Sequence, residues 1–371
     1  MSKKVCHITT VHPPFDTRIF HKEAKTLAKA GYDVTLIAQH NKDEVVDGIK
    51  IIALPKAKNR FHRMTILTFK AFQLALQQKG DIYHFHDPEL IPVGLILKLL
   101  GKKVIYDVHE DLPRQILSKW WIPKSFRVIT GNAMELLEGI TALFFEAIVT
   151  VTPKIASRFP KNKTVLVQNF PIQDEFVLTE DVAYTSRAPL IAYAGGINVI
   201  RGIFEMIRAI ELLPKELEAR LVLAGTFSPA SLKEEVCLLP GWRRVEFLGW
   251  QSIQQVKYLL GVSRIGLVTL HSIINYLDSY PVKLFEYMSA AIPVIASDFP
   301  LWREIVEGAG CGLLVDPLNP EAIAEAITYL LTHPDEAKNM GLNGRKAIEE
   351  KYNWKNEGNK LLELYKRILQ G

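Results

Sequence analysis

Short apolar runs alternate along the whole chain with longer segments in which apolar positions recur every three or four residues. The runs predict buried strands and the longer segments predict amphipathic helices, an alternation typical of α/β proteins with parallel sheets. In the first half the predicted strands are Val5–Thr9, Val34–Ala38, Ile51–Leu54, Ile82–Phe85, Val104–Tyr106, Ala147–Val151 and Val165–Gln168. In the second half they are Leu190–Ala194, Leu221–Ala224, Val245–Phe247, Ile265–Val268, Val294–Ala296 and Gly312–Val315.

Helical patterns fill the spaces between these strands, and a polar stretch interrupts the alternation once, at Pro171–Pro189. We therefore predict two doubly wound, Rossmann-like domains, over residues 1–170 and 189–353, joined by a linker over 171–188. The predicted helices include Ile19–Ala30, Thr65–Gln78, Leu90–Leu100, Glu321–Leu331, Pro334–Lys351 and Trp354–Leu369.

Composition fits this architecture, because 371 residues with 48% hydrophobic and 23% charged positions suit two globular domains. The three cysteines are far apart and form neither a metal-binding nor a redox spacing. No signal peptide and no apolar run long enough for a spanning helix is evident, so we expect a cytoplasmic protein.

Charge is distributed unevenly within the total of +5, with +7 on residues 1–180 and −2 on residues 181–371. Residues 48–80 and 112–130 each contain several lysines and arginines and no acidic residue. The first half is therefore expected to bind an anionic partner. Nucleic acid is disfavoured as that partner, because no recognised nucleic-acid-binding module is present.

A glycine-rich loop follows the first predicted strand of the second domain. Gly195 and Gly196 allow close backbone approach, the helix after them offers free N–H groups, and Arg201 adds a guanidinium suited to phosphate. The spacing is neither the dinucleotide fingerprint nor a phosphate-binding P-loop. A plain tight turn explains the glycines equally well on this evidence alone.

A second helix start is predicted near Pro281, with Ser279 as its N-cap and Tyr280 beside it. Lys283 then lies one turn into the helix, on the same face as Glu286. Glu286 interrupts an apolar helical surface, where a carboxylate is costly without a partner. An ion pair between these two side chains is the alternative to a ligand-binding role.

These segments resemble the retaining nucleotide-sugar glycosyltransferases of glycosyltransferase family 4, which have the GT-B architecture of two Rossmann-like domains facing a central cleft. The likeness covers nearly the whole chain. It rests on Gly195-Gly196 with Arg201-Gly202, on the stretch Pro281–Met288 leading into Ile292–Ala296, and on Gly310–Pro317. The resemblance also implies that the last helix, residues 354–371, crosses back to the first domain.

The resemblance assigns roles to the acidic pair that this family writes as E-x7-E. It implies that Glu286 holds the ribose hydroxyls of the donor and that the earlier acid, here the shorter Asp278, lies near the reacting sugar. It implies that Arg201 contacts the diphosphate, with Lys283 or backbone N–H groups replacing the basic residue usually found at Gly196. Donor contacts are expected at Gly195, Gly196, Gly225, Ser279 and Tyr280 as well. Ala291 stands where the family usually has glycine.

In the first domain, polar residues follow three predicted strands, and the resemblance places them at the acceptor side. His109 is the candidate for orienting the reacting centre, and Asp16, Arg18, His86 and Asp87 are the candidates for binding acceptor. Asp16 is equally well explained as a helix cap. His84 and His86 have a spacing that suits a metal, but a third ligand is not evident, so we predict no metal site.

The segment Arg114–Lys124 interleaves cations with tryptophans, and Phe61–Leu76 has a similar character. This composition suits a bilayer interface, although the tryptophans could equally pack inside and the cations could bind an anionic glycan. The hypothesis is that the first domain docks on the inner face of the cell membrane, with contacts from Lys119, Trp120, Trp121 and Lys124.

The function that the resemblance implies is transfer of a sugar from a UDP or GDP sugar to a glycan or lipid-linked hydroxyl in cell-envelope polysaccharide synthesis, with retention of configuration. The chain contains no D-x-D triplet, so we expect no metal on the diphosphate and no cofactor beyond the nucleotide sugar as co-substrate. Two alternatives stay open, which are a nucleotide-sugar epimerase of the same fold and a non-catalytic donor-binding or scaffold subunit.

Overall fold

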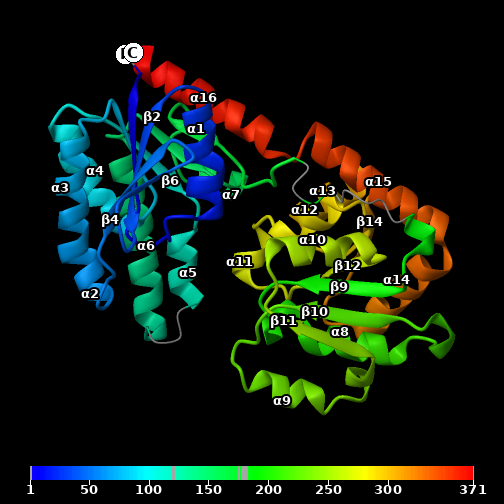
Figure 1. Cartoon of the computed structure of the whole chain (residues 1–371). Helices are drawn as coiled ribbons and strands as arrows, with labels where there is room; N and C mark the ends of the chain where they lie inside the picture. Colours follow the sequence, from blue (N-terminus) through cyan, green and yellow to red (C-terminus); the bar gives the residue numbers. More distant parts are fainter. Residues whose placement is uncertain (1, 119–121, 174–175, 177–182, 371) are drawn as a thin grey trace. The chain divides into compact units, whose positions relative to one another are not determined.

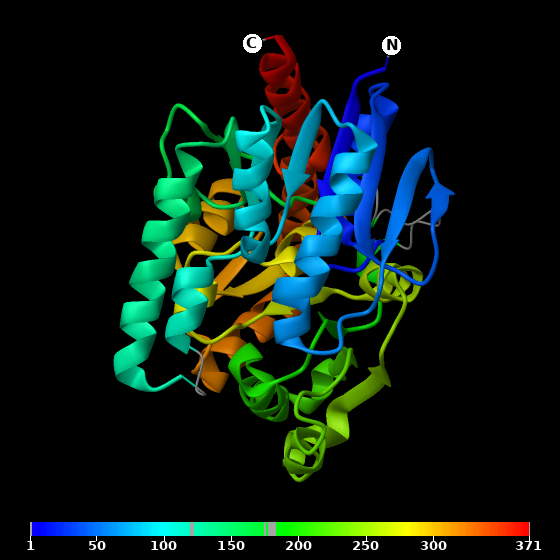
Figure 2. The same ribbon diagram turned by 90° about the vertical axis from the view of Figure 1, so that its left-hand side faces the viewer.

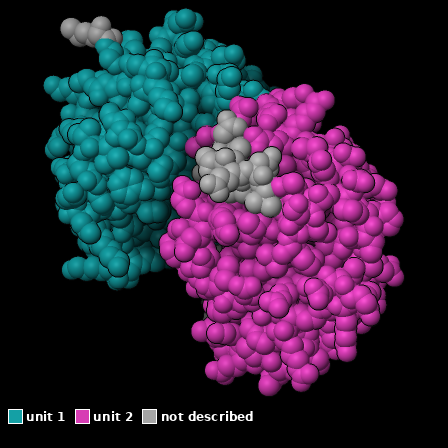
Figure 3. Space-filling view, turned by 45° about the vertical axis from the view of Figure 1, so that its right-hand side comes forward, with its two compact units in different colours: residues 1–169, 354–371 teal, residues 170–353 magenta. Residues whose placement is uncertain are grey.

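The computed structural model describes residues 2–118, 122–173, 176 and 183–370. The chain forms two compact units (Figure 3). Unit 1 comprises residues 1–169 together with 354–371, and unit 2 comprises residues 170–353. Within the described residues, no helix has both the length and the apolar character needed to cross a membrane.

Unit 1 is built on an eight-stranded sheet with the order β3-β4-β2-β1-β5-β6-β7-β8 (Figure 1). Its described strand pairs are parallel except for β3 with β4. The strands are β1 (Lys4–Ile8), β2 (Asp33–Gln39), β3 (Glu44–Val46), β4 (Ile49–Leu54), β5 (Ile82–Phe85), β6 (Lys103–Val108), β7 (Ala147–Thr150) and β8 (Thr164–Leu166). The helical segments are η1 (Thr17–Ala24), α1 (Lys25–Lys29), α2 (Arg60–His62), η2 (Arg63–Leu67), α3 (Thr68–Gln78), η3 (Pro88–Leu90), α4 (Ile91–Leu99), α5 (Leu112–Ser118), α6 (Lys124–Ala142), α7 (Pro153–Ala156) and α16 (Trp354–Gln370).

The two faces of this sheet differ in chemistry. Side chains alternate between faces along a strand, so Cys6 and Ile8 of β1 point into the apolar core under α3 and α4, whereas His7 points to the opposite face. On that opposite face His84 of β5 meets α16, where the Tyr365 hydroxyl lies 2.8 Å from His84 Nδ1. One face of unit 1 is therefore an ordinary core and the other contains buried polar groups.

Helix α16 follows unit 2 in the sequence and packs on unit 1. Its Trp354 indole donates a hydrogen bond of 2.8 Å to the Thr26 hydroxyl, and its Glu357 carboxylate accepts one of 2.8 Å from the Gln168 backbone. Figure 1 shows α16 in red alongside α1 and β2. The last helix thus seals the polar face of the first sheet.

Unit 2 contains a six-stranded parallel sheet with the order β11-β10-β9-β12-β13-β14. Its strands are β9 (Leu190–Ala194), β10 (Arg220–Ala224), β11 (Val245–Gly249), β12 (Ile265–Val268), β13 (Val294–Ser297) and β14 (Gly312–Val315). Its helical segments are η4 (Tyr184–Ser186), η5 (Val199–Arg201), α8 (Ile203–Leu212), η6 (Lys215–Leu217), α9 (Leu232–Cys237), η7 (Pro240–Arg244), α10 (Ile253–Val262), α11 (Ile274–Leu277), α12 (Val282–Ser289), α13 (Pro300–Ala309), α14 (Pro320–Thr332) and α15 (Pro334–Glu350).

Both sheets are doubly wound, and the strand order reverses next to the first strand of each unit. In unit 2 the reversal lies between β9 and β12, and in unit 1 it lies between β1 and β5. Loops at the carboxyl ends of these strands diverge to opposite faces and leave a crevice, which is where ligands bind in such sheets. The site should therefore be sought in the loops after β9 and β1.

The sequence pattern predicted these elements well, with three corrections. Every predicted strand is present with its ends shifted by at most two residues, but the short polar strand β3 was missed. The predicted helix Ile19–Ala30 is instead a π-helical segment, η1, that continues into α1. The predicted linker contributes Phe176 and Tyr184 to the core of unit 2. Burial of these large aromatic side chains removes much apolar surface from water and so stabilises the fold.

Ala291 occupies a strained turn between α12 and β13. Its φ of 53° lies in the left-handed region, where a Cβ crowds the following carbonyl oxygen. Glycine has no such penalty, which agrees with the family pattern noted above. The preceding Ala290 has a φ of −78° and is unstrained.

Replacing Ala291 by glycine should stabilise unit 2 by about 0.5–1 kcal/mol, because relief of strain outweighs the entropy that glycine adds to the unfolded chain. The midpoint of urea unfolding measures this change. Ala290→Gly is the matched control and should lower the midpoint, since its alanine is already in a favourable region. A lower midpoint for Ala291→Gly would contradict the strain argument.

Candidate functional site

The loop after β9 and the loop after β10 approach each other through glycine backbone. Gly195 has a φ of 130° and Gly225 a φ of 156°. A Cβ added at Gly225 would lie 1.8 Å from the Gly195 carbonyl oxygen, which is a severe overlap. A further glycine, Gly202, precedes α8 and would place its Cβ 2.2 Å from the Thr269 carbonyl oxygen. Glycine is therefore required at Gly225 and Gly202, where the backbones of neighbouring loops come into close contact.

Two cationic side chains lie against this loop. The guanidinium of Arg201 donates a hydrogen bond of 3.2 Å to the Gly196 carbonyl. The ammonium of Lys283 lies 4.9 Å from the centre of the Tyr193 ring and so close to Gly195 that an added Cβ would sit 2.5 Å from Nζ. Burial, together with the charge of Arg201, lowers the pKa of Lys283 to about 8, although Glu286 opposes both effects. The paired positive charges create an anion site.

A cavity of about 350 Å³ opens beside these cations. Glycine backbone forms one wall and Glu286 of α12 contributes a carboxylate. The remaining wall is largely apolar or amide in character; the complete lining is Phe176, Ala194, Gly195, Gly196, Ala224, Gly225, Thr226, Trp250, Gln251, Ile253, Val256 and Glu286. Its size is within the range of small-molecule sites. The cavity can hold a phosphate-bearing ligand whose hydroxyl groups reach Glu286.

The residues before α12 are placed differently from the prediction. Asp278 follows α11 and is not among the residues that line the first cavity. The hydroxyl of Ser279 donates a hydrogen bond of 3.2 Å to the Tyr276 carbonyl, and the N-cap of α12 is Pro281. The prediction that Ser279 caps this helix is therefore wrong, because its side chain completes the preceding turn instead. Tyr280 packs on Phe170 in the same unit, with ring centroids 5.7 Å apart.

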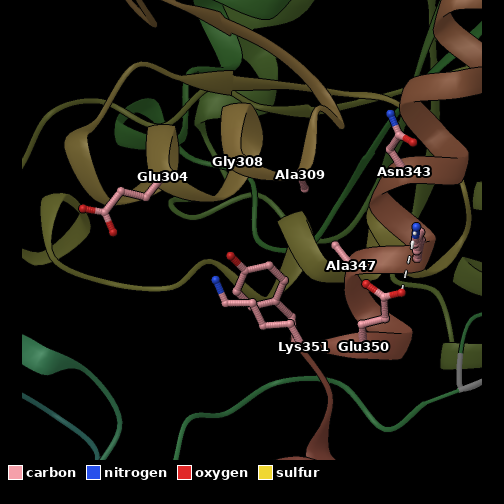
Figure 4. Close-up of a pocket in the computed structure, with 9 residues that line it drawn as sticks. Glu304, Gly308, Ala309, Asn343, Ala347, Glu350 and Lys351 are labelled. Carbon is pink, nitrogen blue, oxygen red and sulfur yellow. Dashed lines mark ion pairs between the residues drawn. The ribbon is translucent and has the colours of Figure 1, made fainter.

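A second cavity of about 350 Å³ in unit 2 lies between α13 and the end of α15 (Figure 4). Its labelled side chains include Glu304, Asn343, Glu350 and Lys351. This cavity is not at the carboxyl ends of the strands where the sheet reverses, and its glycine, Gly308, is in a helix interior. We therefore place the ligand site of unit 2 at the first cavity.

In unit 1, a histidine pair lies at the carboxyl ends of β1 and β6. His109 Nε2 is 3.0 Å from His12 Nε2, and His109 Nδ1 is 3.6 Å from a carboxylate oxygen of Asp107. Burial alone would lower the pKa of His109, but the nearby Asp107 carboxylate outweighs burial and raises it. His109 is thus held beside a carboxylate and can carry a proton or a positive charge.

The residues predicted to bind acceptor are not on an open surface. Asp16 caps η1, accepting hydrogen bonds from the backbone of Arg18 and Ile19, so its alternative role as a helix cap is the one observed. Arg18 is buried and donates two hydrogen bonds, of 2.9 and 3.1 Å, to Asp107.

The other two acceptor candidates are buried as well. His86 Nδ1 is 3.1 Å from Asp107, and Asp87 accepts hydrogen bonds from the hydroxyl of Thr9 and the backbone of Thr10. These polar groups were correctly placed at strand ends. Their side chains turn inward because buried ion pairs and hydrogen bonds satisfy them there.

Three residues of this polar group were not selected from the sequence. His12 contacts His109, Asp107 joins Arg18 to His86, and Glu23 lies fully buried nearby. Asp107 lies near the end of the apolar strand β6, and a carboxylate in that context is a signal that could have identified it. Glu23 stands in the polar stretch His21–Lys25, whose local sequence carries no such signal.

The segment predicted to contact membrane is described only in part. Lys119, Trp120 and Trp121 lie outside the described residues, and Lys124 is an exposed residue at the start of α6.

Solved structures with the same architecture extend over the whole chain. A sucrose-phosphate synthase from Thermosynechococcus elongatus matches with a TM-score of 0.79 at 18% identity, covering 99% of both chains. HepE from Anabaena in complex with UDP-glucose matches with a TM-score of 0.75 at 13% identity, covering 98% of this chain and 99% of that one. WaaG, described as a glycosyltransferase of lipopolysaccharide biosynthesis, matches with a TM-score of 0.73 at 16% identity, covering 97% and 99%. The fold is that of the GT-B glycosyltransferases.

Sequence comparison identifies the family. The model of glycosyltransferase family 4 matches residues 17–168, and that of the group 1 glycosyl transferases matches residues 180–347. An uncharacterised glycosyltransferase of Methanocaldococcus jannaschii is 28% identical over 49% of this chain and 45% of its own length. An MMP alpha-(1->4)-mannosyltransferase of Mycolicibacterium hassiacum is 20% identical over 81% of this chain and 74% of its own length. The chain belongs to glycosyltransferase family 4, and its match spans less than half of the first of these relatives.

The lowered pKa of Lys283 predicts pH-dependent binding of diphosphate. A diphosphate prefers the ammonium form, which is lost as the pH rises through about 8 in the free protein. The affinity for inorganic pyrophosphate should therefore fall about tenfold between about pH 7 and pH 9, measured by titration calorimetry. Lys283→Arg stays charged throughout and should show no such fall. A similar fall in that variant would assign the titration to another group.

Proposed function

We propose that this chain transfers a sugar from a nucleoside diphosphate sugar to a hydroxyl group of a glycan or lipid-linked acceptor, with retention of anomeric configuration. The observation that carries the proposal is the cavity in unit 2, where glycine backbone, two cations and the Glu286 carboxylate come together. The UDP-glucose complex of HepE, which has the same fold, supports a uridine nucleotide sugar as the first donor to test.

Each part of the donor has a matching group in this proposal. The diphosphate lies at the glycine loop and the start of α8, facing Arg201 and Lys283. The ribose hydroxyls donate hydrogen bonds to Glu286, which compensates a carboxylate on an otherwise apolar helix. The base occupies the wall formed by Trp250 and Gln251.

The reaction breaks the bond between the anomeric carbon and the diphosphate oxygen. Negative charge then develops on the leaving diphosphate, and Arg201 and Lys283 stabilise it without a metal ion. The acceptor hydroxyl attacks from the face that the leaving group vacates and transfers its proton to an oxygen of the departing diphosphate, which retains the configuration. His109, held by Asp107 and His12, orients the sugar at the reacting carbon.

The acidic residue Asp278 has the least support in this scheme, since it follows α11 and does not line the cavity. We assign it a contact with the donor sugar through one intervening water, because its side chain is one methylene shorter than the family's glutamate.

Two measurements separate this function from its alternatives. A nucleotide-sugar epimerase converts the donor with no acceptor present, whereas a transferase needs one. A non-catalytic subunit binds the donor and gives no product across an acceptor panel. Formation of a new glycosidic bond that depends on both substrates therefore supports the proposal and excludes both alternatives.

The role of Glu286 can be tested by binding alone. A thermal-shift screen of nucleoside diphosphates selects the preferred base, since a ligand that binds only the folded state raises its melting temperature. Glu286→Ala should then lower the affinity for that nucleoside diphosphate about 10- to 100-fold, the effect of losing hydrogen bonds to a charged group. The affinity for inorganic pyrophosphate should stay unchanged.

Lys283→Met is the control for the diphosphate contact, and it should weaken the binding of both the nucleoside diphosphate and inorganic pyrophosphate. Equal losses for both ligands in Glu286→Ala would remove the ribose assignment. Failure of every nucleoside diphosphate to bind the wild-type chain would remove the donor proposal itself.

We also propose that unit 1 docks on an anionic lipid surface through an apolar face, consisting of exposed side chains on α6 and on α2 to α3. On α6 the residues Phe126, Ile129, Leu136, Ile140 and Leu143 recur at helical spacing and are 49–65% exposed. Phe61, Met64, Ile66 and Phe69 are exposed on the other segment, which lies in the stretch 48–80 that has lysines and arginines and no acid.

Figures 1 and 2 both place α2 and the start of α6 at the same end of unit 1. Apolar side chains combined with basic residues favour an anionic bilayer over a neutral one. A glycosyltransferase that uses a lipid-linked acceptor would need such a surface.

Vesicle flotation tests this surface. The wild-type chain should float with vesicles containing anionic phospholipid and stay behind with neutral ones. Phe126→Ser combined with Ile129→Ser should lower the bound fraction several-fold, because these side chains no longer enter the interface. Leu238→Ser with Leu342→Ser, exposed apolar residues of unit 2, should not. Failure of the wild-type chain to float with anionic vesicles would contradict the proposal.

A further inference from the structure

Four side chains of types that can bind a metal ion meet inside unit 1. They are His7 of β1, Glu23 of η1, and His84 and the neighbouring His86 at β5. One donor atom from each side chain lies within 4.8 Å of the others. None of the four is more than 2% exposed. The sequence offered the histidines of the His-x-His motif, and the fold adds two further donors.

The donor atoms surround a common point. His7 Nδ1 and His86 Nε2 are 2.9 Å apart. Glu23 Oε2 is 4.0 Å from His7 Nδ1, 4.0 Å from His84 Nδ1 and 3.9 Å from His86 Nε2. Ligands on a tetrahedral zinc ion with bonds of about 2.1 Å lie about 3.4 Å from one another. The four separations above differ from this value by about 0.5–0.6 Å, and no two of the donor atoms are more than 4.8 Å apart.

Hydrogen bonding leaves the carboxylate of this cluster unsatisfied. Neither oxygen of Glu23 has a hydrogen-bond partner among the described residues, although Oε1 is 3.0 Å from Arg18 Nε. Arg18 directs its hydrogen bonds to Asp107 and to the Val167 carbonyl. One guanidinium thus faces two buried carboxylates, and an uncompensated buried carboxylate is costly. A divalent cation would compensate it.

The surroundings match those of known metal sites in two respects. His86 turns its other nitrogen, Nδ1, to Asp107 at 3.1 Å, the carboxylate–histidine arrangement that orients metal ligands. Glu23 lies in the π-helical segment η1, and such segments are frequent at functional sites.

We propose that His7, Glu23, His84 and His86 bind one divalent transition-metal ion, with zinc the best fit to three imidazoles and one carboxylate. The ion joins β1, β5 and η1 and fixes His86, and through it Asp107, beside His109. It lies in the interior of unit 1 and has no contact with the diphosphate, so it is independent of the donor proposal. Because the ligands are fully buried, the ion must enter as the chain folds.

Metal content tests the site directly. The full-length chain should be expressed with added zinc or cobalt and purified without a metal-affinity step or chelator. We expect about one ion per chain by elemental analysis. Cobalt(II) should give the intense visible absorption of a four-coordinate site. Less than about one tenth of an ion per chain in both media, with no cobalt absorption, would overturn the proposal and leave a proton-sharing cluster.

Two variants show which side chains bind the ion. Glu23→Gln has the same size and should lower the bound metal at least tenfold, together with the cobalt absorption. Tyr365→Phe is the matched control, because it removes a buried hydroxyl 2.8 Å from His84 Nδ1 and keeps all four donors, so its metal content should equal that of the wild type. Unchanged metal in Glu23→Gln would overturn the ligand assignment. If that variant does not fold, the wild-type measurement decides the proposal.

Discussion

Two like charges held beside a glycine backbone are the constraint on which unit 2 depends. Lys283 and Arg201 both lie against the loop after β9, and the charge of Arg201 helps to lower the pKa of Lys283. An anion beside the two cations would favour the charged form of Lys283. A Cβ at Gly225 would overlap the Gly195 carbonyl oxygen at 1.8 Å, and a Cβ at Gly195 would lie 2.5 Å from Lys283 Nζ. Packing and ligand binding therefore select the same residues.

Unit 1 presents the opposite electrostatic problem. Its sheet buries Glu23 and Asp107 next to one guanidinium, that of Arg18, and lines the rest of that face with histidines. An apolar core of the same volume would be at least as stable, so a polar core is retained for a role beyond stability. Helix α16 closes this face although it follows unit 2 in the sequence. Burial of the polar group therefore depends on the last helix.

Membership of glycosyltransferase family 4 suggests separate tasks for the cation pair of unit 2 and the buried histidine group of unit 1. A sugar nucleotide brings two negative phosphates, which unit 2 can neutralise through Arg201 and Lys283. The acceptor hydroxyl is neutral and must be oriented and deprotonated. His109, supported by Asp107, is suited to orientation because its proton is held by a nearby carboxylate. In the proposed function, the two chemical tasks are assigned to two sheets of similar topology.

Much of the donor site could be read from the sequence, and much of the acceptor side could not. Gly195, Gly196 and Glu286 line one cavity, because a loop after a strand and a helix start are local features with fixed positions in a doubly wound sheet. Arg18 and Asp87 also lie at strand ends, yet their side chains turn inward. The direction of a side chain depends on which distant groups can satisfy it, and no local pattern contains that information.

The sequence by itself determined the two parallel sheets, their order along the chain and the loops that carry polar residues. Hydrophobic periodicity and glycine positions act over a few neighbouring residues, so they are visible in one dimension. Only the tertiary structure decided that His7, Glu23 and His84 meet, and that Tyr365 closes the group from the far end of the chain. Charges and hydrogen bonds act through space between residues hundreds of positions apart, and their partners become known only when the chain is folded.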